Sequence, residues 1–245
     1  CSSSPGTPAS GSSSGPGSTP AVTGTVTVFA ASSLKETFTS IAKRFEAAHP
    51  GTTVVLSFAA SSALATQITS GAPADVFASA SAKDMATLTS AGAATAPTTF
   101  ATNSLTVVVP SANPAQIAGL ADLARAGVKV AQCQPAVPCG VLAAKVLATA
   151  GLTVTPATLE PDVKSVLTKV RLREVDAGLV YVTDAVAAAG SVTAVPMPAG
   201  VNATTAYPIA ALSHAANPAG ARAFVDAVVS AEGLAVLKAA GFGAP

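Results

Sequence analysis

Two serines in the N-terminal part of the chain stand where a predicted strand gives way to a predicted helix. Ser33 and Ser61 follow runs rich in β-branched residues over positions 25–31 and 52–58. The first turn of a helix has backbone N–H groups without partners inside the helix, and these carry a partial positive charge. A helix start with a serine hydroxyl therefore indicates a site for an anion. Ser33 also opens Ser33-Leu34-Lys35-Glu36, which matches a capping box and predicts Ser33 as the N-cap.

Three further donors of this kind occur later in the chain. Predicted helices open at Pro138-Cys139-Gly140 and at Asp162-Val163, and Tyr181 ends a buried strand with a phenolic hydroxyl. If the two halves of the chain face each other, all these groups point into one cleft of neutral donors without Lys or Arg. Taken singly, each residue also fits a structural role, because the serines could be plain helix caps and Tyr181 a packed strand residue.

The elements that position these groups alternate between strand and helix. In the first part of the chain the pattern predicts strands over 25–31, 52–58 and 74–78, and helices over 34–48, from 61 to before 71, and over 82–91. This order is typical of a parallel sheet with helices on both faces.

The rest of the chain repeats the alternation. It predicts strands over 104–109, 128–132, 178–182, 193–198 and 207–212, and helices over 119–125, 138–150, 162–170, 218–229 and 231–240, with a short one from Asp184. No linker rich in Gly and Pro separates two α/β halves, so the chain is expected to cross between them at strand level, near 101–104 and 203–207. The last segment then returns to the first half.

Composition excludes several classes of protein. Of 245 residues, 50% are hydrophobic and 10% are charged, which excludes a disordered chain. The net charge of +1 gives no basic field to attract a nucleic acid. A serine hydrolase is disfavoured because there is no G-x-S-x-G elbow and the two histidines, His49 and His214, lie in unsuitable contexts. A phosphate-handling enzyme would require a P-loop or a Lys/Arg clamp, and neither occurs. We therefore expect no enzyme and no catalytic residue.

The cysteines point to an exported protein. Cys1 is followed by an uncharged stretch of Ser, Gly, Pro and Thr up to Pro20, which resembles the tether of a bacterial lipoprotein with Cys1 as the lipidated residue. Cys133 and Cys139 are then expected to form a disulfide that closes a small loop. A metal site is the weaker alternative, because two thiols without a nearby His fall short of a zinc ligand set.

Six segments, taken in order, resemble the substrate-binding protein of molybdate ABC transporters. The segments are residues 26–34, 57–68, 71–77, 138–140, 161–164 and 178–185. The resemblance runs from about residue 24 to Gly241-Phe242. No single segment is specific, and the order of all six carries the identification.

The resemblance implies an α/β fold of the periplasmic-binding-protein type (type II), with two lobes that each have a mostly parallel sheet flanked by helices. The expected organisation is a tether over 1–23, lobe I over 24–102 and 206–245, and lobe II over 103–205. The implied protein is an extracytoplasmic monomer, held at the outer face of the cell membrane by its lipid alone. Its partners are an oxyanion and the permease subunits of an ABC transporter, without nucleic acid and without a cofactor.

The resemblance also implies which residues bind the anion. They are Ser33, Ser61, Cys139, Val163 and Tyr181, with Cys139 and Val163 contributing only backbone N–H groups. No residue is expected to bind a metal cation directly, since the metal arrives as an oxyanion. The position of Cys139 is usually alanine-like in the family, so a bond to Cys133 would pin the loop that offers this amide.

The chemistry of the ligand agrees with this donor set. Molybdate and tungstate are dianions without a proton at neutral pH, so their site requires donors only. Hydrogenphosphate carries a proton and requires an acceptor, usually a carboxylate, and the five groups include no carboxylate. Sulfate, or another tetrahedral oxyanion, remains the alternative, because its exclusion depends on cavity size. Asp75 and Asp184 are expected to brace loops or cap helices rather than to bind the anion.

Overall fold

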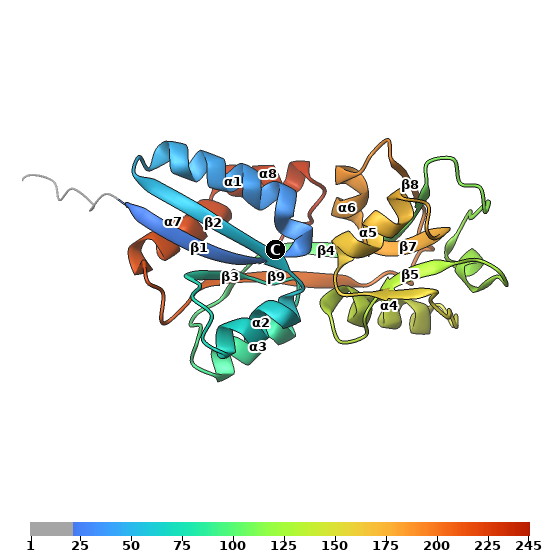
Figure 1. Cartoon of the computed structure of the whole chain (residues 1–245), viewed down its shortest axis with the longest axis horizontal. Helices are drawn as coiled ribbons and strands as arrows, with labels where there is room; N and C mark the ends of the chain where they lie inside the picture. Colours follow the sequence, from blue (N-terminus) through green and yellow to red (C-terminus); the bar gives the residue numbers. More distant parts are fainter. Residues whose placement is uncertain (1–21) are drawn as a thin grey trace, which may run out of the picture.

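The structure is a computed structural model, and it describes residues 22–245 of the chain. Nearly all of the predicted tether over 1–23, and the predicted lipidation site Cys1, lie outside the described residues. The strands follow one path in the order β2-β1-β3-β9-β4-β7-β5-β6, and β8 pairs with β4 beside this path. Figure 1 shows two groups of helices and strands at opposite ends of an elongated molecule, with β4 and β9 running between them.

The group at the N-terminal end is called the first lobe here. Its strands β1, β2 and β3 pair in parallel, with β1 in the middle, and the closing helices α7 and α8 pack beside α1. Its elements are β1 (Gly24–Ala31), a 3₁₀ turn (Ser32–Leu34), α1 (Lys35–Ala48), β2 (Thr52–Ala59), α2 (Ser61–Thr69), β3 (Val76–Ala78), α3 (Ala82–Ser90), α7 (Pro218–Val229) and α8 (Ala231–Ala239).

The group at the other end is called the second lobe. Strand β5 pairs in parallel with β6 on one side and with β7 on the other. Its elements are a 3₁₀ turn (Leu120–Ala124), β5 (Val130–Cys133), α4 (Pro138–Thr149), β6 (Thr158–Glu160), α5 (Val163–Arg171), β7 (Ala177–Tyr181), α6 (Val182–Ala187) and β8 (Val192–Val195).

Two long antiparallel strands connect the lobes. Strand β4 (Thr98–Pro110) pairs with β9 (Thr204–Ala211) through Ser104, and from Leu105 onward it pairs with β7. The proposed lobe limits at 102/103 and 205/206 therefore lie within these two strands. Because two adjacent strands make the connection, the lobes are joined by hydrogen-bonded backbone rather than by loose linkers.

Two sequence predictions about elements are wrong, and one element was missed. The strand expected over 104–109 begins at Thr98, because residues 98–104 pair with β9. The helix expected over 119–125 is a 3₁₀ turn, and the short strand β6 was not predicted. These segments are short or polar, so their structure depends on neighbours that a local pattern does not contain.

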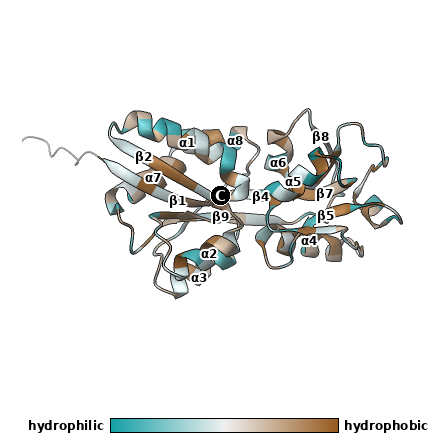
Figure 2. Cartoon of the chain, in the orientation of Figure 1, coloured by the Kyte–Doolittle hydropathy of each residue, from teal (hydrophilic) through white to brown (hydrophobic). Residues whose placement is uncertain are grey.

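Each lobe has its own buried core. In the first lobe the rings of Phe38, Phe100 and Phe224 pack together, with Phe38 at centroid distances of 5.9 Å from Phe100 and 6.0 Å from Phe224. The second lobe is filled mainly by Val and Leu side chains. Figure 2 shows the hydrophobic residues along the strands and the hydrophilic ones on the outer parts of the helices. The cores of the two lobes are thus formed by largely separate sets of side chains.

Candidate functional site

A small pocket lies between the two lobes, where the carboxyl end of β1 and the start of α2 face the starts of α4 and α5. Its lining residues are Ala31, Ser32, Ser33, Ala59, Ala60, Ser61 and Ala80 from the first lobe, and Pro138, Cys139, Asp162, Val163 and Tyr181 from the second. All five residues that the sequence predicted are among them. With the open solvent at its mouth included, the pocket holds about 210 Å³ of empty space. The site therefore suits a compact solute.

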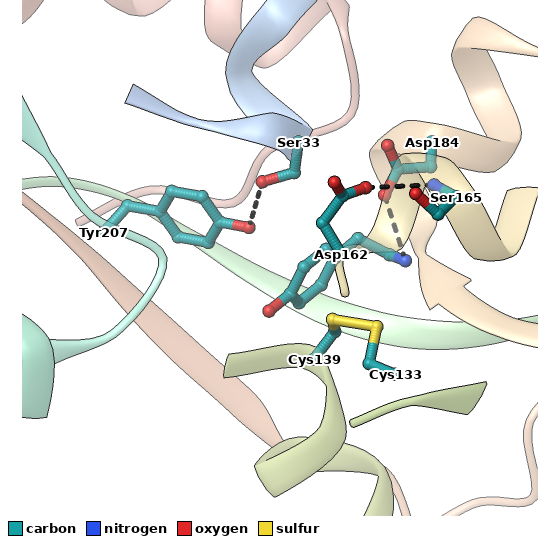
Figure 3. Close-up of a disulfide and its surroundings, with 8 residues drawn as sticks. Ser33, Cys133, Cys139, Asp162, Ser165, Asp184 and Tyr207 are labelled. Atoms are coloured by element: carbon teal, nitrogen blue, oxygen red, sulfur yellow. Dashed lines mark hydrogen bonds between the residues drawn. A yellow bond between two sulfur atoms is a disulfide. The ribbon is translucent and has the colours of Figure 1, made fainter. Parts of the chain in front are cut away.

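Ser33 lies on the wall of the first lobe, but it is not the helix cap that the sequence predicted. A 3₁₀ turn over Ser32–Leu34 separates β1 from α1, and this turn shifts the N-cap of α1 to Leu34. No side-chain capping bond occurs at either start. Instead, the Ser33 Oγ atom lies 2.9 Å from the hydroxyl of Tyr207 on β9, as Figure 3 shows. Tyr207 was missed because its partner is 174 residues away along the chain.

Ser61 is the first residue of α2 and is almost fully buried. The N-cap of this helix is Ala60, and the Ser61 Oγ atom accepts a hydrogen bond of 2.9 Å from the backbone N–H of Ala80. Because the oxygen accepts this bond, the hydroxyl hydrogen of Ser61 remains available to donate into the pocket.

The start of α4 is held against the end of β5 by a disulfide. Cys133 is the last residue of β5, Cys139 lies in the first turn of α4, and their sulfur atoms are bonded at 2.02 Å (Figure 3). At Gly140 a Cβ atom would lie 1.9 Å from the carbonyl oxygen of Gln134, so only glycine allows this close approach. The predicted pairing of the two cysteines is thus present, and it sits directly behind the Cys139 amide.

We expect that removal of this disulfide will weaken both the fold and the binding of the ligand. In the chain-entropy relation, a loop of this size stabilises the protein by about 2 kcal/mol. The loss of the cross-link should also let the Cys139 amide move, with a decrease in affinity of about 3- to 10-fold. The measurement is thermal unfolding and calorimetric titration of the variant with both Cys133→Ser and Cys139→Ser. Unchanged stability and affinity would show that the bond does not order this wall.

Val163 opens α5, as predicted, and Asp162 is its cap. The Asp162 Oδ1 atom accepts a hydrogen bond of 2.9 Å from the backbone N–H of Ser165, which Figure 3 shows. Asp162 also lines the pocket, so a carboxylate is present beside the site although the predicted donor set contained none. Its capping bond turns one carboxylate oxygen onto the helix start rather than toward a ligand.

Tyr181 supplies the most informative atom of the pocket. Its side chain is 1% exposed. The hydroxyl of Tyr207 lies close enough to affect its pKa, but no polar atom among the described residues is in hydrogen-bond geometry with the Tyr181 hydroxyl. A buried hydroxyl without a partner lowers the stability of the fold by about 1–3 kcal/mol. Such a group is expected where the hydroxyl serves binding rather than folding. Burial raises the pKa of Tyr181 well above its usual range, so the group keeps its proton and can only act as a neutral donor or acceptor.

The two aspartates that were expected to be braces have that role. Asp75 accepts hydrogen bonds from the backbone N–H groups of Thr27 at 2.7 Å and of Asn217 at 3.0 Å. Asp184 accepts one of 3.3 Å from the N–H of Tyr181 and is fully buried. Neither aspartate lines the pocket.

A lysine next to the site joins the two lobes. The Lys164 Nζ atom lies 2.9 Å from Asp184 Oδ1 in the second lobe and 2.7 Å from Glu36 Oε2 in the first. Burial lowers the pKa of Lys164, but the two carboxylates raise it more, so the amine has a raised pKa and stays charged. Burial also raises the pKa of Asp184, although Lys164 opposes this shift. The positive charge is therefore used by carboxylates, and the pocket itself presents no Lys or Arg among its lining residues.

The donor set defines what the site can do. It presents the hydroxyls of two serines and a tyrosine, together with helix-start amides from both lobes. Among residues 22–245, no group of three or more His, Cys, Asp or Glu side chains is placed to hold a metal ion. Such a pocket can surround a small anion with neutral donors, with the Asp162 carboxylate at its edge bonded to the start of α5, and its two walls belong to different lobes.

The chain is similar to bacterial solute-binding proteins in its sequence. A model of the family described as bacterial extracellular solute-binding protein matches residues 26–243. The chain is 44% identical over 221 residues to the molybdate-binding protein ModA of Mycobacterium tuberculosis, which covers 90% of this chain and 85% of the relative.

Two solved structures extend the comparison to the fold. The periplasmic molybdate-binding protein of Azotobacter vinelandii has a TM-score of 0.79 at 26% identity, with 90% of this chain and 99% of that one covered. The sulfate-binding protein SubI of Mycobacterium tuberculosis has a TM-score of 0.80 at 20% identity, with 89% and 86% covered. At that identity, the second likeness concerns the fold alone.

Proposed function

The chain belongs to the family of bacterial extracellular solute-binding proteins, and on this premise we propose that it captures molybdate or tungstate between its lobes for an ABC transporter. The observation that carries the proposal is the pocket lined by hydroxyls and helix-start amides, in which the buried Tyr181 hydroxyl has no partner in hydrogen-bond geometry within residues 22–245. An oxygen of a tetrahedral dianion can accept a hydrogen bond from this hydroxyl. Ser33, Ser61 and the amides of Cys139 and Val163 are the other proposed ligands.

Neutral donors alone can bind a dianion that carries no proton, and the lining formed by the described residues contains no Lys or Arg. Each oxygen of molybdate or tungstate can accept hydrogen bonds, and bonds to a charged partner are worth about 1.5–3 kcal/mol each. Hydrogenphosphate would bring a proton that requires an acceptor. Asp162 is the carboxylate in the lining, and one of its oxygens already accepts from the backbone N–H of Ser165. The site is therefore proposed to distinguish molybdate and tungstate from hydrogenphosphate by the hydrogen bonds that each anion can form, rather than by charge.

Sulfate is the alternative ligand, because it has the same charge and shape and its binding protein in Mycobacterium tuberculosis shares the fold. The 44% identity to a molybdate-binding protein, over most of both chains, favours molybdate. Molybdate has longer bonds to oxygen than sulfate, and we propose that the size of the pocket selects the larger anion.

Capture is proposed to include closure of the lobes. One wall brings Ser33 and Ser61, and the other brings Cys139, Val163 and Tyr181, so an anion that contacts both walls stabilises the closed arrangement. The closed form is what the permease subunits of the transporter would bind. Since the relatives are solute-binding proteins, catalysis is not proposed.

The proposal is tested by thermal unfolding with added anions. At a concentration about 100 times the dissociation constant, a ligand stabilises the native state by about 2.7 kcal/mol. For a protein of this size, that should raise the melting temperature by roughly 5–10 °C. We expect this shift with molybdate and tungstate, and a small one with equal concentrations of sulfate or phosphate. Equal shifts with all four anions would contradict the proposed specificity.

The ion pair between the lobes leads to a kinetic prediction. Glu36→Gln breaks the contact of Lys164 with the first lobe but leaves its contact with Asp184. Glu36 is half exposed, so the pair is worth at most about 1 kcal/mol, and we expect the anion to dissociate about 2- to 5-fold faster. The measurement is stopped-flow dissociation at low ionic strength, where screening is weak.

The control for this prediction is Glu174→Gln, which breaks the pair of Glu174 with Lys169 inside the second lobe. It should leave the dissociation rate unchanged. An equal effect of both variants, or none of Glu36→Gln, would show that the pair between the lobes does not contribute to retention.

Proteins of this family act outside the cytoplasm, and no helix within residues 22–245 is both long and apolar enough to cross a membrane. We propose that the protein is a monomer held at the membrane by a lipid on Cys1. The composition of residues 2–20 supports a tether. Mass spectrometry of the N-terminal peptide from native membranes tests the anchor, and an unmodified Cys1 thiol would contradict it.

A further inference from the structure

The hydroxyl of Ser33 has a second partner that the ligand assignment does not include. We propose that Tyr207 is a positioning residue, which donates its hydrogen bond to Ser33 Oγ and so leaves the serine proton free for the anion. This inference rests on the proposed function, because it concerns how the same pocket presents one of its donors. Tyr207 is not among the lining residues, so it acts on a ligand through a residue that it contacts, and Ser33 is the lining residue to which its hydroxyl is hydrogen-bonded.

The position of the Tyr207 hydroxyl is set by the packing of its ring. The side chain is 0% exposed and lies on β9, opposite Ala101 of β4. Three aromatic rings contact it edge-on, with centroid distances of 5.3 Å to Phe242, 6.0 Å to Tyr181 and 6.3 Å to Phe100. Because these contacts leave the ring little freedom, its hydroxyl stays 2.9 Å from Ser33 Oγ.

The direction of the bond follows from the chemistry of the two hydroxyls. A phenol is the more acidic group and the better donor, whereas the oxygen of serine is the better acceptor. Burial raises the pKa of Tyr207, so the phenol keeps the proton that it donates. The Ser33 hydroxyl can then direct its own hydrogen elsewhere.

Ser61 provides an independent parallel on the same wall. Its oxygen accepts from the backbone N–H of Ala80, and in that bond the donor is certain because an amide cannot accept at nitrogen. If Tyr207 does for Ser33 what Ala80 does for Ser61, both serine oxygens accept from the protein and both hydrogens face the ligand. The wall would then act as a pure donor surface, which matches an anion without a proton.

A double-mutant cycle tests whether Tyr207 acts through Ser33. The four proteins are the wild type, Tyr207→Phe, Ser33→Ala and the double variant, each titrated calorimetrically with molybdate and with sulfate. We expect Tyr207→Phe to weaken molybdate binding about 3- to 10-fold when Ser33 is present, since a hydrogen bond between neutral groups is worth about 0.5–1.5 kcal/mol. In the Ser33→Ala background the same substitution should change affinity by less than about 2-fold.

The matched control is Tyr181→Phe, the same substitution at a residue that lines the pocket. It should still weaken binding in the Ser33→Ala background, because its hydroxyl is proposed to reach the anion directly. The melting temperature of every variant without ligand separates a folding defect from a binding defect, and a defect common to both backgrounds cancels in the cycle.

The outcomes separate this inference from the function on which it rests. If Tyr207→Phe weakens binding equally in both backgrounds, or in neither, the positioning role is overturned while the proposed function stands. If the wild type binds neither anion, the proposed function fails first and the inference fails with it.

Discussion

Replacement of Tyr181 by phenylalanine is expected to weaken molybdate binding by about 10- to 100-fold and yet to leave the unliganded protein as stable as the wild type, or more stable. A hydrogen bond to a charged partner is worth about 1.5–3 kcal/mol, which corresponds to this loss of affinity. The gain in stability has a separate cause, because the hydroxyl is buried without a partner in the described part of the chain, and its removal relieves that cost.

Calorimetric titration and thermal unfolding of Tyr181→Phe measure the two effects separately. Tyr207→Phe is the natural comparison, since its hydroxyl contacts Ser33 and its loss should not stabilise the protein. A Tyr181→Phe variant that binds molybdate as tightly as the wild type would remove this residue from the ligand set. A variant that loses stability would indicate a protein partner for the hydroxyl.

Replacement of Lys164 by methionine should cost about 3 kcal/mol of unfolding free energy at neutral pH. The substitution keeps the length of the side chain and removes the charge that compensates the fully buried Asp184. Asp184 Oδ2 accepts from the N–H of Tyr181, but within residues 22–245 no donor other than Lys164 is placed at Oδ1, so this oxygen depends on the lysine. The estimate is at the low end for buried pairs, because the Lys164 side chain is 20% exposed.

The loss should depend on pH in a defined direction. Burial already raises the pKa of Asp184 above its ordinary value of 3.8, and the loss of Lys164 raises it further. The native state then binds a proton more readily than the unfolded chain does, so stability is gained as the pH falls through the native pKa toward 3.8. The difference between Lys164→Met and the wild type should therefore shrink as the pH is lowered.

Two further variants sharpen this test by chemical denaturation across pH. Asp184→Asn in the Lys164→Met background should recover much of the lost stability, because it removes the uncompensated charge. Lys169→Met, whose partner Glu174 is exposed, should change the stability by less than about 1 kcal/mol. A loss that is independent of pH and is not recovered by Asp184→Asn would show that Lys164 stabilises through packing alone.

Much of the architecture could be predicted from local patterns. The alternation of strands and helices and the resemblance to the family led to a two-lobed α/β periplasmic-binding fold, which the structural neighbours confirm. The pocket contains all five predicted residues, and Cys133 is bonded to Cys139. These features could be predicted because the residues lie at strand ends and helix starts, which the local sequence itself determines.

The parts that failed depend on contacts between distant segments. The capping box at Ser33 is present in the sequence, but the 3₁₀ turn moves the cap and Tyr207 takes the hydroxyl. Nor could spacing reveal that Lys164 reaches Glu36, 128 residues away along the chain. Asp162 was recognised as a helix start, but its place in the lining depends on how the two lobes face each other.

The identity of the ligand is the central claim, and isothermal titration calorimetry of the wild-type protein tests it most directly. Molybdate, tungstate, sulfate and phosphate should be titrated into the same unliganded preparation at one pH and ionic strength. We predict one molybdate or tungstate bound per chain, with an affinity at least about 100-fold above that of sulfate, a difference of roughly 2.7 kcal/mol. Sulfate binding as tight as molybdate binding, or tight binding of phosphate, would contradict the account.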